Sequence, residues 1–437
     1  MEHKRVAVAT LGCKVNQYES AALEELFRRR GYLVVDFAQP ADVYVINTCT
    51  VTHLGDRKSR QLIRRAVRAN PAAVVAVTGC YVQNAPHEVL AIEGVDLVVG
   101  AGRRAAIVEL AEGAGQGNKR AAVGDFAGPS EFEELPGEAS QDRVRAFLKV
   151  QEGCENFCTY CIVPYARGPL RSRAPEKVLS GAAELLSHGC KEIVLTGIHT
   201  GAYGREPGGA MGLAELLAKL AVLPGLLRLR LSSLEPHDVT GEILDLLASG
   251  PPFCRHVHIP LQSGDDAILK AMGRTYDRLY FRRLSNAIRA KIPDCGITTD
   301  VMVGFPGETD SHFANTLQFA AQMQFSGLHV FKYSPRRGTP AADFDRQVAP
   351  AVKDRRSRQL IALGREMTGR FAAGYLGQTV EVLAEQQTPV AGGQFRLDGL
   401  TDNYLRVIFS GPREALGELV KVRITGLSDI AMQGRII

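Results

Sequence analysis

The sequence predicts an α/β protein with three parts: a parallel-sheet N-terminal domain, a partial or full (β/α) barrel, and a small C-terminal antiparallel β-barrel. Three observations support this prediction. Short β-branched segments alternate with helical stretches over the first 110 residues, six strand-like segments recur about every 30–40 residues after residue 146, and the end of the chain alternates apolar with polar side chains. A chain of 437 residues is long enough for about two to four domains.

The N-terminal domain, residues 1–112, has the pattern of consecutive βαβ units. Short strands with turn signals are separated by helical stretches, an alternation that favours a parallel sheet. The predicted strands are 6–10, 43–47, 73–78 and 96–100, and the predicted helices include 18–30 and 54–69. Residues 113–142 are acidic and contain Gly and Pro, so we expect them to connect this domain to the next.

The second domain, residues 143–372, contains the six regularly spaced strands of the predicted barrel. These strands are 147–151, 192–197, 227–233, 257–262, 297–305 and 328–334. In such a barrel, site residues lie at the carboxyl ends of the strands. Residues 373–437 follow with three alternating segments, which favour an antiparallel barrel of about 60 residues.

The composition is that of a globular protein, because 45% of the residues are apolar and 23% are charged. No apolar run approaches the roughly 18–20 residues of a membrane span, and the charged start leads directly into a predicted strand, so neither a membrane segment nor a signal peptide is expected. Nine cysteines, an odd number, argue against a disulfide framework. We therefore predict a cytoplasmic protein whose cysteines bind metal or take part in catalysis.

Cys154, Cys158 and Cys161, here called the loop cysteines, form the pattern C-x3-C-x2-C directly after the first predicted barrel strand. Three thiolates this close can hold one compact metal centre, but they cannot share a helix face, so a loop has to wrap the metal. Structural zinc normally takes four protein ligands, and the sequence offers no fourth Cys or His nearby. A 4Fe–4S cluster on three cysteines leaves one iron open for a small molecule. We predict such a cluster here; an incomplete zinc knuckle is the alternative.

Cys13, Cys49 and Cys80, here called the sheet cysteines, are far apart in sequence, but each follows a predicted strand of the N-terminal sheet. The carboxyl ends of parallel strands line one crevice, so the topology brings the three thiols together. Gly12 and Gly79 would let the backbone approach a bulky cofactor. The alternative is three buried core cysteines. The remaining cysteines have no such arrangement and are predicted to be core residues: Cys190, Cys254 and Cys295.

The segments around these cysteines resemble a known family. The loop cysteines, with Tyr160 before the last of them, resemble the signature of radical S-adenosylmethionine (SAM) enzymes. TLGCKVNQYES, NTCTVT and TGCYVQ resemble the amino-terminal domain of the methylthiotransferases, and the terminal β unit resembles their TRAM domain, an RNA-binding module. The resemblance covers essentially the whole chain. LGCKVNQYES is similar to the branch that acts on threonylcarbamoyladenosine in tRNA, whereas the isopentenyladenosine branch usually differs after the first Cys.

The resemblance implies a tRNA methylthiotransferase with two 4Fe–4S clusters and two SAM molecules per turnover. The loop cysteines would be catalytic, because their cluster binds SAM, and one-electron reduction cleaves SAM to a 5′-deoxyadenosyl radical that removes the hydrogen from carbon 2 of the adenine. The cluster on the sheet cysteines would supply sulfur, which a second SAM methylates. An aromatic C–H bond is neither acidic nor readily attacked, so acid–base chemistry cannot activate it and a radical is needed. The implied partners are tRNA and a one-electron reductant; the sequence does not identify the reductant or the oligomeric state.

Polar residues at the ends of the barrel strands are candidate SAM contacts, since strand ends carry the site in such barrels. Their alternative role is to cap the helices that follow. The candidates, some of them suggested by the family resemblance, are Thr196, Gly197, Ser232, Glu235, Gln262 and Asp300.

A basic helix close to Cys49 is a candidate RNA surface. Four arginines recur at spacings of three and four, which places them on one helix face: Arg57, Arg60, Arg64 and Arg68. The alternative is an ordinary solvated face. A site for threonylcarbamoyladenosine also needs a cation, because burying an unpaired carboxylate is costly. The segments 165–168 and 335–338 contain arginines that could supply it, and the sequence does not choose between them.

Three other functions compete with this prediction. One is a non-catalytic RNA-binding iron–sulfur sensor, which the many polar strand ends disfavour. The others are methylthiotransferases for isopentenyladenosine in tRNA or for a ribosomal protein, which only the CKVNQ resemblance disfavours.

Overall fold

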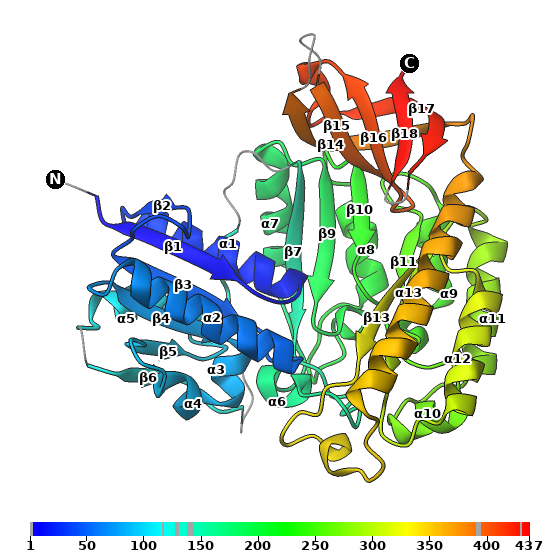
Figure 1. Ribbon diagram of the computed structural model, residues 1–437. Coiled ribbons are helices and arrows are strands. Elements are labelled where there is room, and N and C mark those ends of the chain that lie inside the picture. The colour runs from blue at the N-terminus through cyan, green and yellow to red at the C-terminus, as the bar shows by residue number, and fades with distance from the viewer. Residues whose placement is uncertain (1–2, 116–117, 127–130, 138–143, 390–394, 429–430) are drawn as a thin grey trace.

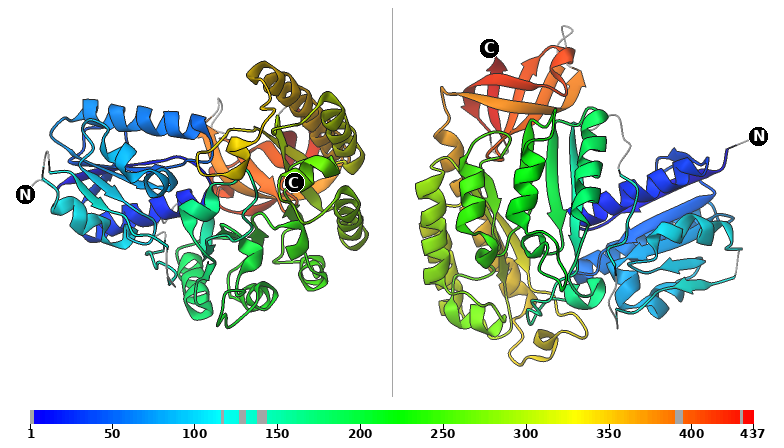
Figure 2. Two further views of the ribbon diagram at one scale, coloured as in Figure 1. Left: turned by 90° about the horizontal axis from the view of Figure 1, so that it is seen from below. Right: turned by 180° about the vertical axis from the view of Figure 1, so that it is seen from behind.

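The protein is described here by a computed structural model that covers residues 3–115, 118–126, 131–137, 144–389, 395–428 and 431–437 (Figure 1). A parallel sheet, a partial barrel and a closed β-barrel follow one another along the chain, as predicted. The parallel sheet with its helices and the closed barrel both pack against the partial barrel in the middle (Figures 1 and 2).

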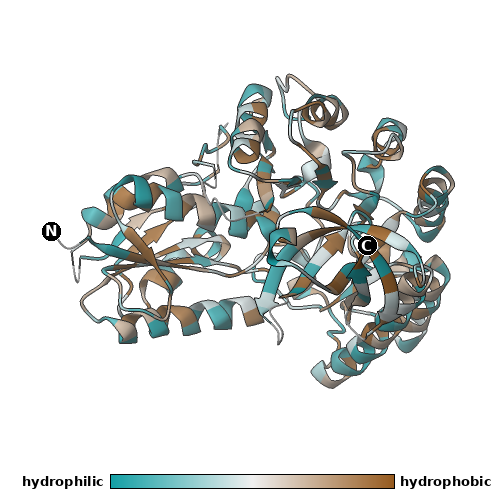
Figure 3. Ribbon diagram, turned by 90° about the horizontal axis from the view of Figure 1, so that it is seen from above, coloured by the Kyte–Doolittle hydropathy of each residue, from teal (hydrophilic) through white to brown (hydrophobic). Residues whose placement is uncertain are grey.

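The N-terminal sheet has six parallel strands in the order β2-β1-β3-β4-β5-β6. Its strands are β1 (Arg5–Thr10), β2 (Leu33–Val35), β3 (Val43–Thr48), β4 (Val74–Gly79), β5 (Leu97–Val99) and β6 (Arg120–Ala122). Its helices are α1 (Lys14–Arg29), α2 (His53–Ala69), α3 (Cys80–Asn84), α4 (Pro86–Leu90) and α5 (Ile107–Glu112). Apolar strand residues pack against helices on both faces, which gives two separate core clusters, and Figure 3 shows these apolar strands between amphipathic helices.

The sixth strand, β6, lies within the stretch 113–142 that was predicted to be a plain connection. It is only three residues long and partly exposed, so it carries no recognisable alternation. Residues 116–117, 127–130 and 138–142 of that stretch lie outside the described residues.

The middle unit is a partial barrel. Its strands run in the orders β8-β7-β9-β10 and β11-β12-β13, and bridges between Leu229 and Phe253 and between Ser233 and His258 join the two halves. The strands are β7 (Arg145–Glu152), β8 (Arg171–Ser172), β9 (Glu192–Gly197), β10 (Arg228–Leu231), β11 (His256–His258), β12 (Gly296–Val303) and β13 (Gly327–Lys332). The helices, most of which cover the outside, are α6 (Val163–Arg167), α7 (Pro175–Ser187), α8 (Leu213–Ala221), α9 (Gly241–Ala248), α10 (Asp266–Ala271), α11 (Arg278–Lys291), α12 (Asp310–Met323) and α13 (Pro350–Ala373). Among the described residues, no strand pairing joins β13 to β7 or β8.

The C-terminal unit is a closed five-stranded barrel in the order β14-β15-β16-β18-β17. Its strands are β14 (Thr379–Pro389), β15 (Phe395–Thr401), β16 (Arg406–Gly411), β17 (Leu419–Leu427) and β18 (Met432–Ile436), paired antiparallel except for β16 and β18. Arg228 and Arg230 of β10 donate to the carbonyl oxygens of Leu400 and Asp402 at 2.7 and 2.8 Å. The closed barrel therefore covers one end of the partial barrel and leaves the carboxyl ends of its strands at the other end (Figure 1).

Candidate active site between the sheet and the partial barrel

The loop cysteines lie on an irregular loop that begins where β7 ends. Gly153, with a φ of +80°, allows a turn that no other residue could make, because an added Cβ would lie 1.8 Å from the carbonyl oxygen of Pro169. The backbone N–H of Cys154 donates to Gly168 at 3.0 Å, and that of Cys161 donates to Cys158 at 2.9 Å. The loop thus curls back on itself and gathers the three thiols.

Two side chains from elsewhere in the partial barrel lie close to these thiols. His199, after β9, lies with its Nδ1 4.0 Å from the Sγ of Cys154, and its Nε2 bonds to Asp238 at 2.8 Å. Burial alone would lower the pKa of His199, but the hydrogen bond with Asp238 and the nearby Cys154 raise it to about 9. Arg274 donates to the Sγ of Cys158 at 3.2 Å and forms an ion pair with Glu235. Burial raises the pKa of the free Cys161 thiol to about 12, so binding a metal centre there has to displace a proton.

The sheet cysteines follow β1, β3 and β4, three strands that are neighbours in the sheet. A Cβ on Gly12 would lie 3.3 Å from the Sγ of Cys49, and a Cβ on Gly79 would lie 2.4 Å from the carbonyl oxygen of Thr48. Burial raises the pKa of Cys49 to about 12, and repulsion from Cys80 and Cys13 contributes to the rise. The parallel topology brings the three thiols together at one edge, as the sequence predicted.

In neither cysteine set do the three sulfur atoms all lie within 4.8 Å of one another. Thiolates bound tetrahedrally to zinc at about 2.3 Å would lie about 3.8 Å apart. Among the residues that the structure describes, the set with three ligand atoms within 4.8 Å of one another consists of His258, Asp300 and His329 instead. Each cysteine set offers three thiols, the donors that iron–sulfur clusters take, and a 4Fe–4S cluster on three of them leaves one iron open.

Arg167 joins the two sets. It ends α6, shortly after the loop cysteines, and its Nε donates to the Sγ of Cys80 at 3.1 Å. Its Nη1 donates to Glu19 at 2.5 Å, and its Nη2 donates to Asn16 at 2.7 Å. Both of these partners lie on α1, which begins directly after Cys13. One guanidinium group thus links the segment after the loop cysteines to two strand ends of the sheet.

Arg167 belongs to a buried group of six charged side chains, here called the interface network. Three carboxylates are balanced by three cations, and all but the partly buried Glu133 are almost completely removed from solvent: Glu19, Glu133, Glu152, Arg104, Lys149 and Arg167. The three cations hold the pKa of Glu19 well below its usual range in spite of its burial. Buried charges are tolerated only when they are paired, so this network fixes the sheet against the barrel.

A second polar contact closes the other side of the opening in the barrel. Arg336, which follows β13, donates to Asp56 at 2.6 Å and to Thr50 at 2.7 Å. The N-terminal unit is thus attached to both edges of the partial barrel, and the two cysteine sets lie on the same side of the molecule.

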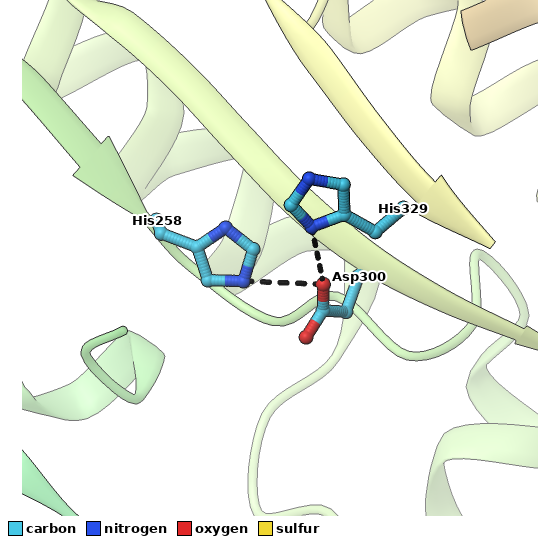
Figure 4. Close-up of side chains that lie close together, drawn as sticks. All are labelled: His258, Asp300 and His329. Atoms are coloured by element: carbon cyan, nitrogen blue, oxygen red, sulfur yellow. Dashed lines mark hydrogen bonds and ion pairs between the residues drawn. The ribbon is translucent and has the colours of Figure 1, made fainter. Parts of the chain in front are cut away.

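The strand-end residues predicted from sequence gather around this opening, in different surroundings. Thr196 is buried, and Ser232 shares a hydrogen bond with Thr200 at 3.1 Å. Gln262 has a φ of +62°, and its backbone N–H donates to the carbonyl of Asp300 at 2.8 Å. The Asp300 carboxylate is already held by His258 and His329 (Figure 4). His199, Asp238 and Arg274 were missed from the sequence; the first two follow strand ends, the signal used for the others, whereas Arg274 does not.

The four predicted RNA-binding arginines lie on α2, and three of them extend into solvent. Arg57, Arg64 and Arg68 are exposed, whereas Arg60 bonds to Tyr81 at 2.8 Å and pairs with Glu88 at 3.6 Å. The remaining cysteines, 190, 254 and 295, are buried as predicted. Among the described residues, no helix combines the length and the apolar character that crossing a bilayer requires.

Comparison with known proteins identifies the family. The profile described as "Uncharacterized protein family UPF0004" matches residues 5–100, and that of the "Radical SAM superfamily" matches residues 148–320. The chain is 45% identical to the threonylcarbamoyladenosine tRNA methylthiotransferase MtaB of Bacillus subtilis, covering 96% of this chain and 93% of that protein. It is 38% identical to the MtaB protein of Aquifex aeolicus, covering 96% of this chain and 100% of that protein. This chain belongs to the radical SAM methylthiotransferase family.

More distant comparisons agree with this assignment. The tRNA-2-methylthio-N(6)-dimethylallyladenosine synthase of Moorella thermoacetica is 35% identical, covering 99% of this chain and 98% of that protein. The radical SAM methyltransferase TsrM of Kitasatospora setae, solved with cobalamin and a [4Fe–4S] cluster, superposes with a TM-score of 0.59 at 16% identity, covering 86% and 96% of the two chains. That similarity concerns the fold. The family uses SAM and two 4Fe–4S clusters, so the cofactors predicted from the sequence are confirmed.

Proposed function

We propose that the protein converts threonylcarbamoyladenosine at position 37 of tRNA to its 2-methylthio derivative. The main observation in support is that Arg167, on the segment after the loop cysteines, contacts both Cys80 and the helix that follows Cys13. The two sets of three thiols come from separate units and face the same opening of the partial barrel. A radical enzyme that transfers sulfur needs two such centres close together. The relatives named for threonylcarbamoyladenosine are 38–45% identical over nearly the whole chain, whereas those named for dimethylallyladenosine are 34–35% identical, which favours the former substrate.

In this proposal, the loop cysteines hold the cluster that binds SAM, and the sheet cysteines hold the auxiliary cluster. When bound, these groups supply a carbon-centred radical and the methylthio group. The protein's part is to position them: Arg274 and His199 donate toward the loop thiols, Arg167 donates toward Cys80, and the interface network keeps the distance between the two sites constant.

The strand-end residues surround the SAM molecule in this proposal. Thr196 and Gly197 lie at the end of β9, next to the loop that carries the cysteines, and are assigned to its methionine part. Ser232, after β10, and Gln262, after β11, offer hydroxyl and amide groups for its polar groups. Glu235, also after β10, offers a carboxylate that is already paired with Arg274. Asp300 is a weaker candidate, because two imidazoles already occupy its carboxylate.

Transfer RNA is the proposed macromolecular partner, and α2 is its proposed contact. The exposed arginines of α2 begin close to Cys49, so a backbone bound there would lie beside the reacting centres. The closed C-terminal barrel is a second candidate for RNA contact. Since tRNA is modified in the cytoplasm, we place the reaction there, with a one-electron reductant as the further partner.

The test is nucleoside analysis together with iron content. Reconstituted enzyme, reduced under anaerobic conditions, should methylthiolate tRNA that carries threonylcarbamoyladenosine at least tenfold faster than isopentenylated or unmodified tRNA, which corresponds to about 1.4 kcal/mol. Equal turnover of isopentenylated tRNA would refute the substrate assignment and leave the radical chemistry intact.

Two triple variants test the assignment of the clusters. Replacing the three loop cysteines with Ala should leave about half of the iron and abolish SAM cleavage. Replacing the three sheet cysteines should also halve the iron but leave SAM cleavage, with no methylthiolated product. A full iron load in the second variant would show that the sheet cysteines hold no cluster.

A further inference from the structure

The arginines considered from the sequence as binders of the substrate's carboxylate are already engaged. Arg167 is buried in the interface network, and Arg336 is paired with Asp56. Arg337, on the segment after β13, is exposed to solvent and is not a buried cation. A buried carboxylate therefore needs a different cation.

Lys14 is a cation inside the partial barrel whose ammonium contacts an aromatic ring but no carboxylate among the described residues. It follows Cys13 directly and begins α1. Its ammonium lies 5.9 Å from the centre of the Tyr404 ring, which stacks on His256 of β11 at 4.5 Å and also contacts Arg230 of β10 at 5.0 Å. These contacts place the Lys14 head group among the barrel strands. Within the described part of the chain, that ammonium makes no hydrogen bond and no ion pair, whereas the neighbouring Arg230 and Arg145 are paired with Glu192 and Glu385.

The residues His258, Asp300 and His329 share this interior with Lys14. They come from the adjacent strands β11, β12 and β13 and turn toward one another (Figure 4). Asp300 accepts from His258 at 3.2 Å and from His329 at 3.1 Å, and Thr298 bonds to the Nδ1 of His258 at 2.9 Å. Thr298 also bonds to His256, the residue under Tyr404, at 2.9 Å. A continuous series of contacts thus begins at the Tyr404 ring beside Lys14 and ends at the half-exposed His329. It passes through His256, Thr298, His258 and Asp300.

The position of Lys14 matches the chemistry of the proposed substrate. In adenosine, carbon 2 and carbon 6, which bears N6, flank the same ring nitrogen, so a group on N6 stays close to the reacting carbon. If sulfur reaches carbon 2 from the site of Cys13, the residue next to Cys13 is within reach of the N6 substituent. The threonylcarbamoyl group ends in a carboxylate, for which an unpaired ammonium is the natural partner.

We propose that Lys14 binds the carboxylate of the threonylcarbamoyl group and that His329, held by Asp300, donates a second hydrogen bond to the same group. This inference rests on the proposed function and adds the residues that select the substrate. A divalent metal ion on His258, Asp300 and His329 is disfavoured, because Lys14 and Arg230 place positive charge in the same interior.

The experiment compares two anticodon stem-loop RNAs that differ only at the carboxylate. One carries threonylcarbamoyladenosine, and the other carries its primary carboxamide, which has the same shape without the charge. Affinity is measured by fluorescence anisotropy on the reconstituted enzyme with SAM and without reductant, so that the readout does not depend on turnover. The variants are Lys14→Gln, Lys14→Arg and His329→Gln, with Arg337→Gln as the matched control at an exposed cation.

The wild type should bind the carboxylate RNA at least tenfold more tightly than the carboxamide, a difference of about 1.4 kcal/mol. Lys14→Gln should bind the two RNAs equally, Lys14→Arg should keep most of the difference, His329→Gln should keep part of it, and Arg337→Gln should match the wild type. Because the contacts of His329 within the described residues are with Asp300 and His258 and not with a cysteine, it provides an independent result if Lys14→Gln lowers the iron content.

Two results would overturn the inference. One is a tenfold preference for the carboxylate RNA over the carboxamide RNA that persists in Lys14→Gln. The other is an equal loss of affinity for both RNAs in that variant. Either would mean that Lys14 does not bind the carboxylate. Failure of the proposed function is recognised separately, because the wild-type enzyme itself would then show no preference between the RNAs or would accept isopentenylated tRNA equally well.

Discussion

Arg167→Gln tests the contact that joins the two cysteine sets. The Arg167 side chain is 1% exposed and forms ion pairs with Glu19 and Glu152. Its removal leaves three buried carboxylates with two cations, and breaking a buried pair in this way costs about 3–5 kcal/mol. We therefore expect the variant to unfold at a clearly lower urea concentration in the reduced, metal-free protein.

The matched control is Arg104→Gln. Arg104 is equally buried and pairs with Glu19 and Glu133 in the same network, but its partners among the described residues are carboxylates and not a thiol. The two variants should lose similar stability. If either variant is as stable as the wild type, the interface network does not hold the sheet against the barrel.

The two variants should differ at the auxiliary cluster. In a background without the loop cysteines, loss of the Arg167 contact to Cys80 should lower the cluster's reduction potential, because a hydrogen bond and a positive charge near sulfur favour the reduced state. A charge-assisted hydrogen bond worth about 1.5–3 kcal/mol limits this fall to about 60–130 mV. Redox titration followed by electron paramagnetic resonance measures it. Equal potentials in Arg167→Gln and Arg104→Gln would refute the assigned contact.

Three further predictions concern the RNA surface, the sheet cysteines and the buried Glu192–Arg230 ion pair of the partial barrel. Changing Arg57, Arg64 and Arg68 to Glu should weaken tRNA binding and reduce the slope of log K against log salt by about two, whereas an unchanged slope would identify a merely solvated face. Gly79→Ala, where a Cβ would lie 2.4 Å from a backbone oxygen, should destabilise the fold by several kcal/mol and lose the iron of the auxiliary cluster. Gly31→Ala, with a similar φ and nothing within 4 Å, should destabilise the fold by only about 1–3 kcal/mol and keep all of the iron. Glu192 is buried, but Arg230 holds its pKa below the usual 4.5, so its stabilising effect is present above pH 4.5 and is lost as the pH falls through the lowered pKa. The difference in melting temperature between wild type and Glu192→Gln should therefore shrink on acidification below pH 4.5, and a difference that stays constant down to pH 3 would contradict this reasoning.

The sequence determined those features that depend on local pattern and on connectivity. Alternating β-branched segments and helices are sufficient for a parallel sheet, and a parallel sheet is sufficient to place the residues after β1, β3 and β4 at one edge. The short spacing of the loop cysteines likewise required a loop that closes on itself. For this reason the grouping of both thiol sets could be predicted from the sequence. The side chains that contact the thiols, such as His199 and Arg274, could not be predicted.

Tertiary structure decided which charged side chains remain available, because pairing depends on residues that are distant in sequence. Arg167 meets Glu19, Arg336 meets Asp56, and Arg60 meets Glu88, so three arginines that looked equivalent to their neighbours are engaged. Lys14 looked unremarkable beside Cys13, yet the fold leaves its ammonium unpaired among the barrel strands. A charge that is costly to bury alone needs a partner of opposite sign, and only the folded arrangement shows which charges have found one inside the protein and which remain for the substrate.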